Sequence, residues 1–202
     1  MADQHAVGDN PTAVTLWLDP VCPFTWNTAR WLTSAADAGR AEISWRLLNL
    51  AILNEGREMP SHLQQRMRDS RAVGRLMSAI RRDLGEGAMV AAYFTFGARH
   101  FDQGVPVSDD LVKEVLTAAG ASGLTPDVVD DAALDELVAQ SHQAGQDAYG
   151  AVGGSPMLTI GGHTFFGPVF TELPAAAPET FTALATLAAV PQFTQLERPR
   201  NH

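Results

Sequence analysis

The stretch LDPVCPFTWNTAR, residues 18–30, holds the single cysteine of the 202-residue chain, Cys22, followed directly by Pro23. Proline suits the first position of a helix, so Cys22 is expected to be the residue that caps that helix. There its side chain would face unpaired backbone N–H groups and the positive end of the helix dipole, both of which favour an anion. The pattern therefore predicts a nucleophilic thiol whose pKa lies below that of a free cysteine.

Thr25 stands three residues after Cys22, and its hydroxyl can donate a hydrogen bond to the sulfur. Because the chain has no second cysteine, it cannot store an internal disulfide. A thiolate at this position can attack a disulfide or another electrophile, and only an external thiol can resolve the mixed disulfide that results. An ordinary small core residue is the alternative interpretation of Cys22.

Three further residues are candidates for a binding site. Ser155 and Pro156 follow two glycines, which allow a backbone or a ligand to approach closely. Asn54 follows the second predicted strand, at the end of the sheet where α/β folds place ligands, although a turn-forming asparagine fits that position equally well. The six histidines show no metal-ligand spacing, and neither GxGxxG nor a P-loop is present, so no metal and no tightly bound cofactor are expected.

Hydrophobic periodicity predicts the elements that position these residues. Alternating apolar residues predict strands at 14–18 and 43–47, and apolar residues at helical spacing predict a helix from Pro23 to about Asp37. A strand, a helix and a strand in so short a span form a βαβ unit with parallel strands and a right-handed crossover. Later, SPMLTI and HTFF flank Gly161-Gly162, a two-residue hairpin turn, and a last helix is expected at about 179–189.

Between these two parts the chain is expected to form four or five helices and no strand. We therefore divide the chain into four segments: a flexible tail (1–11), a βαβ unit (12–55), a helical insertion (56–150), and a ββα unit with a C-terminal tail (151–202).

The composition limits the partners and the compartment. The net charge of -9 argues against nucleic acid, because phosphate contacts need a basic face. Apolar stretches end well before the roughly 18 residues that a transmembrane helix requires, and the first eleven residues do not form a secretory signal. We therefore expect a cytoplasmic protein that binds neither nucleic acid nor membrane. Its oligomeric state stays open, with a homodimer among the alternatives.

The order βαβ, helical block, ββα is that of a thioredoxin fold with a helical insertion. The chain resembles the DsbA-like branch of the thioredoxin superfamily and, more closely, the actinobacterial mycothiol-dependent nitroreductases. The resemblance spans about residues 14–198 and is carried by LDPVCPFTW, LNLAILNE, SHQAGQDAYGAVGGSP and FFGPV. It implies an α/β, DsbA-like fold and a cytoplasmic thiol-disulfide oxidoreductase. The substrates it implies are a small-molecule thiol, mycothiol or similar, and a disulfide or an organic acceptor such as a nitro compound.

The resemblance also implies roles for individual residues. Cys22 is the catalytic nucleophile, and Phe24, which stands at the aromatic position of the family's motif, lines the pocket. The Ser155-Pro156 peptide bond is expected to be cis and to face the sulfur. Thr25 departs from the family, whose pattern has a second cysteine there. Two alternatives stay open: a transferase or isomerase that binds the small thiol as kappa-class glutathione transferases do, and a redox-silent binding protein on the same scaffold.

Overall fold

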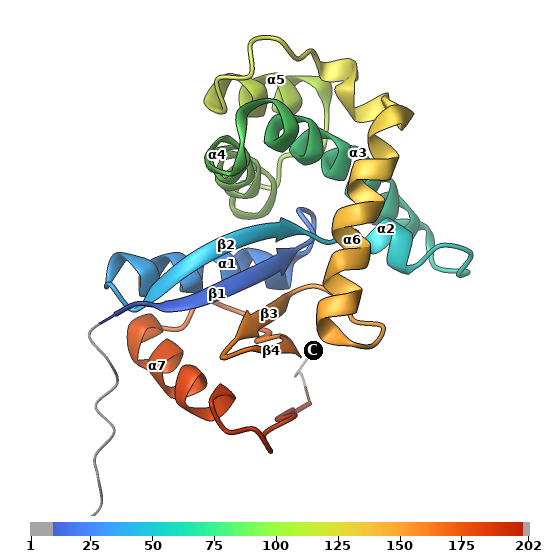
Figure 1. The fold of residues 1–202 in the computed structure, drawn as a ribbon. Coiled ribbons are helices and arrows are strands. Elements are labelled where there is room, and N and C mark those ends of the chain that lie inside the picture. The colour runs from blue at the N-terminus through green and yellow to red at the C-terminus, as the bar shows by residue number, and fades with distance from the viewer. Residues whose placement is uncertain (1–9, 200–202) are drawn as a thin grey trace, which may run out of the picture.

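The computed structural model describes residues 10–199 and shows a four-stranded sheet with helices around it (Figure 1). The strands lie in the order β2-β1-β3-β4; β1 and β2 are parallel, and the other two pairs are antiparallel. Their bounds are β1 Thr12–Leu18, β2 Ala41–Leu47, β3 Met157–Ile160 and β4 His163–Phe166. The parallel βαβ unit and the later hairpin that the sequence predicts are confirmed. Most of the predicted tail, residues 1–9, lies outside the described residues.

Helix α1 (Pro23–Asp37) connects β1 to β2 and begins and ends where the sequence predicts. Pro23 forms its first turn, and the chain leaves the helix through Gly39, whose φ of 70° favours glycine. Its Trp31 donates from the indole N–H to Thr180 at 2.8 Å and packs 5.6 Å from the Phe181 ring. These contacts dock α7 (Ala177–Ala188) onto α1.

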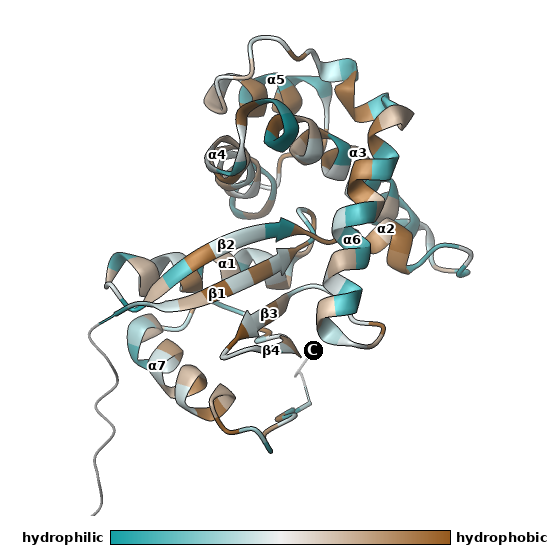
Figure 2. Cartoon of the chain, viewed as in Figure 1, coloured by the Kyte–Doolittle hydropathy of each residue, from teal (hydrophilic) through white to brown (hydrophobic). Residues whose placement is uncertain are grey.

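The insertion is helical, as expected. The short helix α2 (Leu50–Leu53) precedes it. The main helices of the insertion are α3 (Ser61–Leu84), α4 (Glu86–Gly97), α5 (Asp109–Ala118) and α6 (Asp135–Tyr149), with short helical turns at Ala98–Asp102, Pro126–Asp130 and Ala132–Leu134. Helices α3, α4 and α5 stand together beyond β2, and α6 runs back to the sheet (Figure 1). Hydrophobic and hydrophilic residues recur by turns along α3, α5 and α6, as amphipathic helices require (Figure 2). The main hydrophobic core, which includes Leu16, Trp31, Leu76 and Phe96, runs from the sheet into the insertion. A second, smaller cluster consists of Trp17, Leu48 and Met157.

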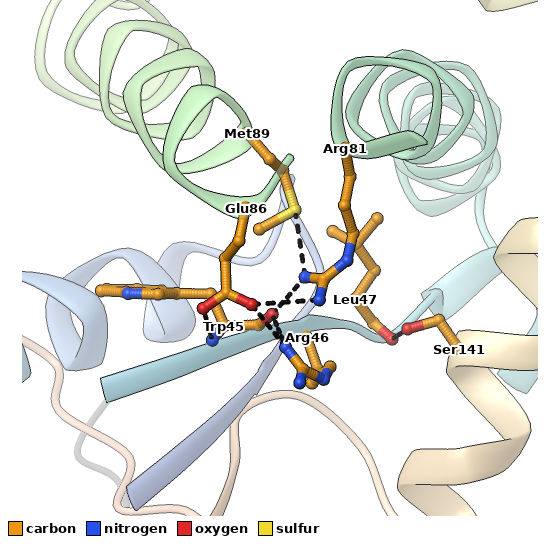
Figure 3. A network of polar contacts seen from close by, with 7 residues as sticks. All are labelled: Trp45, Arg46, Leu47, Arg81, Glu86, Met89 and Ser141. Carbon is orange, nitrogen blue, oxygen red and sulfur yellow. Dashed lines mark hydrogen bonds and ion pairs between the residues drawn. The ribbon is translucent and has the colours of Figure 1, made fainter. Parts of the chain in front are cut away.

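A network of polar contacts covers the outer edge of β2 (Figure 3). Glu86 accepts the amide N–H of Trp45 at 3.0 Å, and Arg81 donates to the Trp45 carbonyl at 2.5 Å. Ser141 donates to the Leu47 carbonyl at 2.7 Å. An uncovered edge strand invites pairing with another chain, so these contacts both protect the edge and fasten α3, α4 and α6 to the sheet.

The hairpin between β3 and β4 turns at Gly161 and Gly162, whose φ values are 61° and 80°. Both values are positive, as the predicted turn requires, and glycine adopts them without steric cost. Among residues 10–199, no helix combines the length and the apolar composition that crossing a bilayer demands.

Candidate active site

Cys22 stands directly before the first turn of α1, opposite the loop that precedes β3. Its thiol donates to the carbonyl oxygen of Ser155, 133 positions away in the sequence, at a distance of 3.3 Å. The Ser155-Pro156 peptide bond is cis, as the resemblance implies. The structure thus brings Cys22, Thr25, Ser155 and Pro156 together at the carboxyl end of β1.

A chain of hydroxyl groups leads to the sulfur. The Asp19 amide N–H donates to the Ser155 Oγ at 2.8 Å, and Ser155 Oγ lies 2.7 Å from Thr25 Oγ1. An amide can only donate, so the Ser155 oxygen accepts there and its own proton is directed to Thr25.

The Thr25 proton is then free to point at the Cys22 sulfur, and donation from the Thr25 side chain acts to lower the pKa of the thiol. If Thr25 donated to Ser155 instead, the Ser155 proton would have no acceptor in the described part of the chain. Since buried donors are almost always satisfied, Ser155 donates to Thr25.

Burial raises the pKa of the Cys22 thiol, and the nearby Asp19 charge raises it further. Hydrogen bonds from the Thr25 side chain and from the backbone amides of Thr25 and Phe24 oppose that rise. The prediction of a pKa below that of a free cysteine is therefore wrong for this state of the protein. The helix N-terminus supplies the expected donors, but Cys22 is only 4% exposed, and the lost hydration of the thiolate outweighs them.

Asp19 lies fully buried beneath the site. One of its carboxylate oxygens accepts the Val21 amide at 2.9 Å; the other accepts the Leu50 amide at 2.7 Å and the Ser70 hydroxyl at 2.5 Å. Burial raises the pKa of Asp19, although these hydrogen bonds oppose the rise. The carboxylate joins the end of β1 to α2 and α3, and so fixes the loop that carries Cys22. Sequence reasoning missed this role, whose one signal is the position of Asp19 at the end of a predicted strand.

Of the other predicted site residues, Pro23 and Phe24 lie beside Cys22, and Asn54 lies at the end of α2. Pro23 is the first residue of α1, and Phe24 follows it, half-buried, with its amide among the donors near the sulfur. Asn54 ends α2: its Nδ2 donates to the Leu50 carbonyl at 2.9 Å, and its Oδ1 accepts from Arg57 at 3.4 Å. It lines an open cleft of about 960 Å³ between α2 and α3, whose lining does not include Cys22.

Side chains, not a backbone, approach the two glycines before the cis proline closely. A Cβ on Gly153 would lie 2.5 Å from the Met157 sulfur, and one on Gly154 would lie 3.2 Å from the Phe166 ring. Phe166 is 47% exposed and Val152 is 77% exposed, so apolar surface borders the loop that faces Cys22. Such surface suits an organic ligand better than a charged one.

Within residues 10–199 no cluster of three or more histidine, cysteine or acidic side chains could hold a metal ion. A family model described as "Rv2466c-like: Mycothiol-dependent nitroreductase Rv2466c" matches residues 21–198. The chain belongs to the Rv2466c-like family. The match includes both the cysteine motif and the cis-proline loop, which the fold brings together.

This Rv2466c-like protein is also similar to other proteins in sequence or in structure. "Uncharacterized protein Rv2286c" of Mycobacterium tuberculosis is 27% identical over 198 residues, which cover 94% of this chain and 83% of that protein. The structure of probable DsbA oxidoreductase SCO1869 from Streptomyces coelicolor matches with a TM-score of 0.57 and 19% identity, over 93% of this chain and 94% of the other. A 2-hydroxychromene-2-carboxylate isomerase matches with a TM-score of 0.58 and 16% identity, over 88% and 95%. At such identities the two structures establish the fold alone, a DsbA-like thioredoxin fold with a helical insertion.

Proposed function

We propose that this Rv2466c-like protein is a thiol-disulfide oxidoreductase that acts through Cys22 and a small-molecule thiol of the mycothiol type, with nitro compounds as acceptors. The family match supports the reaction class. The observation that carries the proposal is the position of the Cys22 sulfur, at the N-terminus of α1 and 3.3 Å from the Ser155 carbonyl oxygen. Phe24, Ser155 and Pro156 border that position and form the proposed substrate contacts.

The cycle needs one protein thiol. The Cys22 thiolate attacks a disulfide formed by the small thiol and a second thiol; a bond forms between Cys22 and the small thiol, and the second thiol leaves and takes up a proton. Another molecule of the small thiol then attacks this mixed disulfide, which releases Cys22 and the disulfide of the small thiol. Thr25 cannot perform this second attack, so the resolving thiol comes from solution.

A nitro acceptor draws on the same chemistry. Two molecules of the small thiol become one disulfide and supply two electrons and two protons, which convert a nitro group into a nitroso group and water. The apolar surface of Phe166 and Val152 beside the site suits an aromatic acceptor. A cytoplasmic location fits this role, because a reducing compartment keeps the small thiol in its reduced form.

A transferase or isomerase that holds the small thiol noncovalently is the second candidate. It is favoured by one observation, the raised pKa of Cys22, because a neutral buried thiol is a poor nucleophile. In this case Cys22 and Thr25 would position the bound thiol without reacting.

Turnover of a nitroaromatic compound in the presence of mycothiol tests the proposal, with Cys22→Ser as the matched variant. We expect one mycothiol disulfide for every two electrons delivered to the nitro compound, and loss of turnover in Cys22→Ser. Turnover that Cys22→Ser retains would favour noncovalent use of the thiol. Absence of both turnover and thiol binding would leave only a redox-silent binding protein.

A further inference from the structure

The cis-proline loop, residues 150–156, is built from residues that leave its backbone free. It begins at Gly150, which ends α6 with a φ of 74°, and it contains Gly153 and Gly154 directly before Ser155. Val152 in the same loop is 77% exposed. Glycine loses more conformational freedom on folding than any other residue, so a loop of this composition needs contacts that fix its backbone.

Gln146, in the last turn of α6, supplies such contacts. Its Nε2 donates to the Gly153 carbonyl at 3.0 Å, and its Oε1 accepts the Gly153 amide N–H at 2.7 Å. A neighbouring strand would exchange the same two hydrogen bonds, and a side-chain amide can replace it because it both donates and accepts. Gly153 lies before β3, which begins at Met157, so Gln146 extends the ordered backbone beyond the sheet.

The position of Gly153 fixes that of Ser155, which covers the sulfur. The Ser155 carbonyl accepts the proton of the Cys22 thiol at 3.3 Å, and Cys22 is only 4% exposed. A hydrogen bond donated by the neutral thiol favours the neutral form, and so does burial. If the Ser155 backbone moved away, the thiol would lose that bond and water would reach the thiolate. Both changes would make the sulfur ionise and react more readily.

We propose that Gln146 is a positioning residue that holds the cis-proline loop closed over Cys22. Its part in catalysis rests on the proposed function, in which Cys22 reacts with a small thiol, whereas the closure is a property of the free protein. A loop held in this way presents the same Ser155-Pro156 backbone to every ligand, and such preorganisation lowers the entropy that binding costs.

The test is Gln146→Glu, whose effect depends on pH. The ionised carboxylate still accepts the Gly153 N–H, but it sets a negative charge against the Gly153 carbonyl; the protonated carboxyl group can donate to that carbonyl again. The probe is dithiodipyridine, a disulfide that releases one coloured thiopyridone when the Cys22 thiolate attacks it. Its reaction with the free protein is followed between about pH 3.5 and pH 8, a range that includes the ordinary glutamate pKa of about 4.3.

We expect Gln146→Glu to react about five- to tenfold faster than the unchanged protein at neutral pH, the effect of losing one ordinary hydrogen bond. The ratio of the two rates should fall toward one as the pH falls through the pKa of the new carboxyl group. Gln146→Met keeps the length of the side chain and removes both polar groups, so it should react faster at every pH. It also provides the test if Gln146→Glu does not fold.

Gln143→Glu is the matched control, because Gln143 lies on the same helix and donates to Asp147 at 2.8 Å, away from the loop. We expect it to leave the rate unchanged. Unchanged rates in Gln146→Glu and Gln146→Met would overturn the proposal, and a lower melting temperature beside them would show that Gln146 serves the fold alone. A faster but pH-independent reaction of Gln146→Glu would also overturn it. The probe contains no mycothiol, so the outcome is independent of whether Cys22 reacts with that thiol.

Discussion

Replacing Thr25 by valine removes the hydroxyl group that stands between Ser155 Oγ and the Cys22 sulfur. Thr25 is fully buried, and valine keeps its branched shape, so the change is confined to the hydroxyl. A hydrogen bond to a charged group contributes about 1.5–3 kcal/mol, and one pKa unit corresponds to about 1.4 kcal/mol. Since the lost bond stabilises the thiolate, we expect the Cys22 pKa to rise by about one to two units above its already raised value.

The same change affects stability, because the Ser155 proton loses its acceptor 2.7 Å away. A buried donor without a partner costs about 1–3 kcal/mol, so the free energy of unfolding should fall by that amount. Ultraviolet titration of the thiolate measures the first effect, and urea denaturation at neutral pH measures the second.

Thr33→Val is the matched control, since Thr33 lies on the same helix and its hydroxyl donates to the Ala29 carbonyl, away from the site. We expect it to leave the Cys22 titration unchanged. If Thr25→Val and Thr33→Val both leave the Cys22 midpoint within a few tenths of a unit of the unchanged protein, the hydroxyl chain does not act on the sulfur and the reasoning is refuted.

Three further substitutions test other parts of the account. Thr25→Cys should form an internal disulfide with Cys22 and make small-thiol adducts transient, as mass spectrometry under oxidant would show; a variant that stays reduced with persistent adducts would contradict the placement of residues 22 and 25. Burial opposes ionisation of Glu86, but interactions with Trp45, Arg46 and Arg81 outweigh it and lower the pKa of Glu86. The ionised carboxylate therefore stabilises the fold above the ordinary carboxyl pKa. This stabilisation is lost as the pH falls through the pKa that Glu86 has in the folded protein. Glu86→Gln should therefore lower the free energy of unfolding by about 1 kcal/mol at pH 7, a difference that shrinks below about pH 4 in urea titrations; a pH-independent difference would argue against the ion pairs. Gly97→Ala places a methyl group against the Trp26 indole and should cost about 1–3 kcal/mol in the same assay, whereas an unchanged midpoint would mean that the indole moves freely.

The sequence predicts much of the fold because local signals agree with one another. Helix α1 begins at Pro23, whose ring fixes φ, and ends before Gly39, which tolerates a positive φ; both signals can be read without a structure. The Gly161-Gly162 turn is a local signal of the same kind. These signals fix the order of elements, and the order leads to the DsbA-like thioredoxin fold.

The site is only partly predictable because its contacts join distant segments. That Ser155 faces Cys22 follows from the family resemblance, since nothing in the spacing of the two residues requires the 3.3 Å contact. The rise in the Cys22 pKa depends on burial, which the helix position alone does not reveal. Asp19 carries no motif, and its importance appears only when its hydrogen bonds can be seen.

The central claim is that Cys22 forms a mixed disulfide with a small thiol. Intact mass measurement after exposure to oxidised mycothiol at mildly alkaline pH, where part of the thiol is ionised, tests it most directly. The account predicts a mass increase of one mycothiol unit per chain, located on Cys22, absent in Cys22→Ser and reversed by excess reduced thiol. An unmodified mass, under conditions in which the Cys22 thiolate is shown by its absorbance to be present, would contradict it.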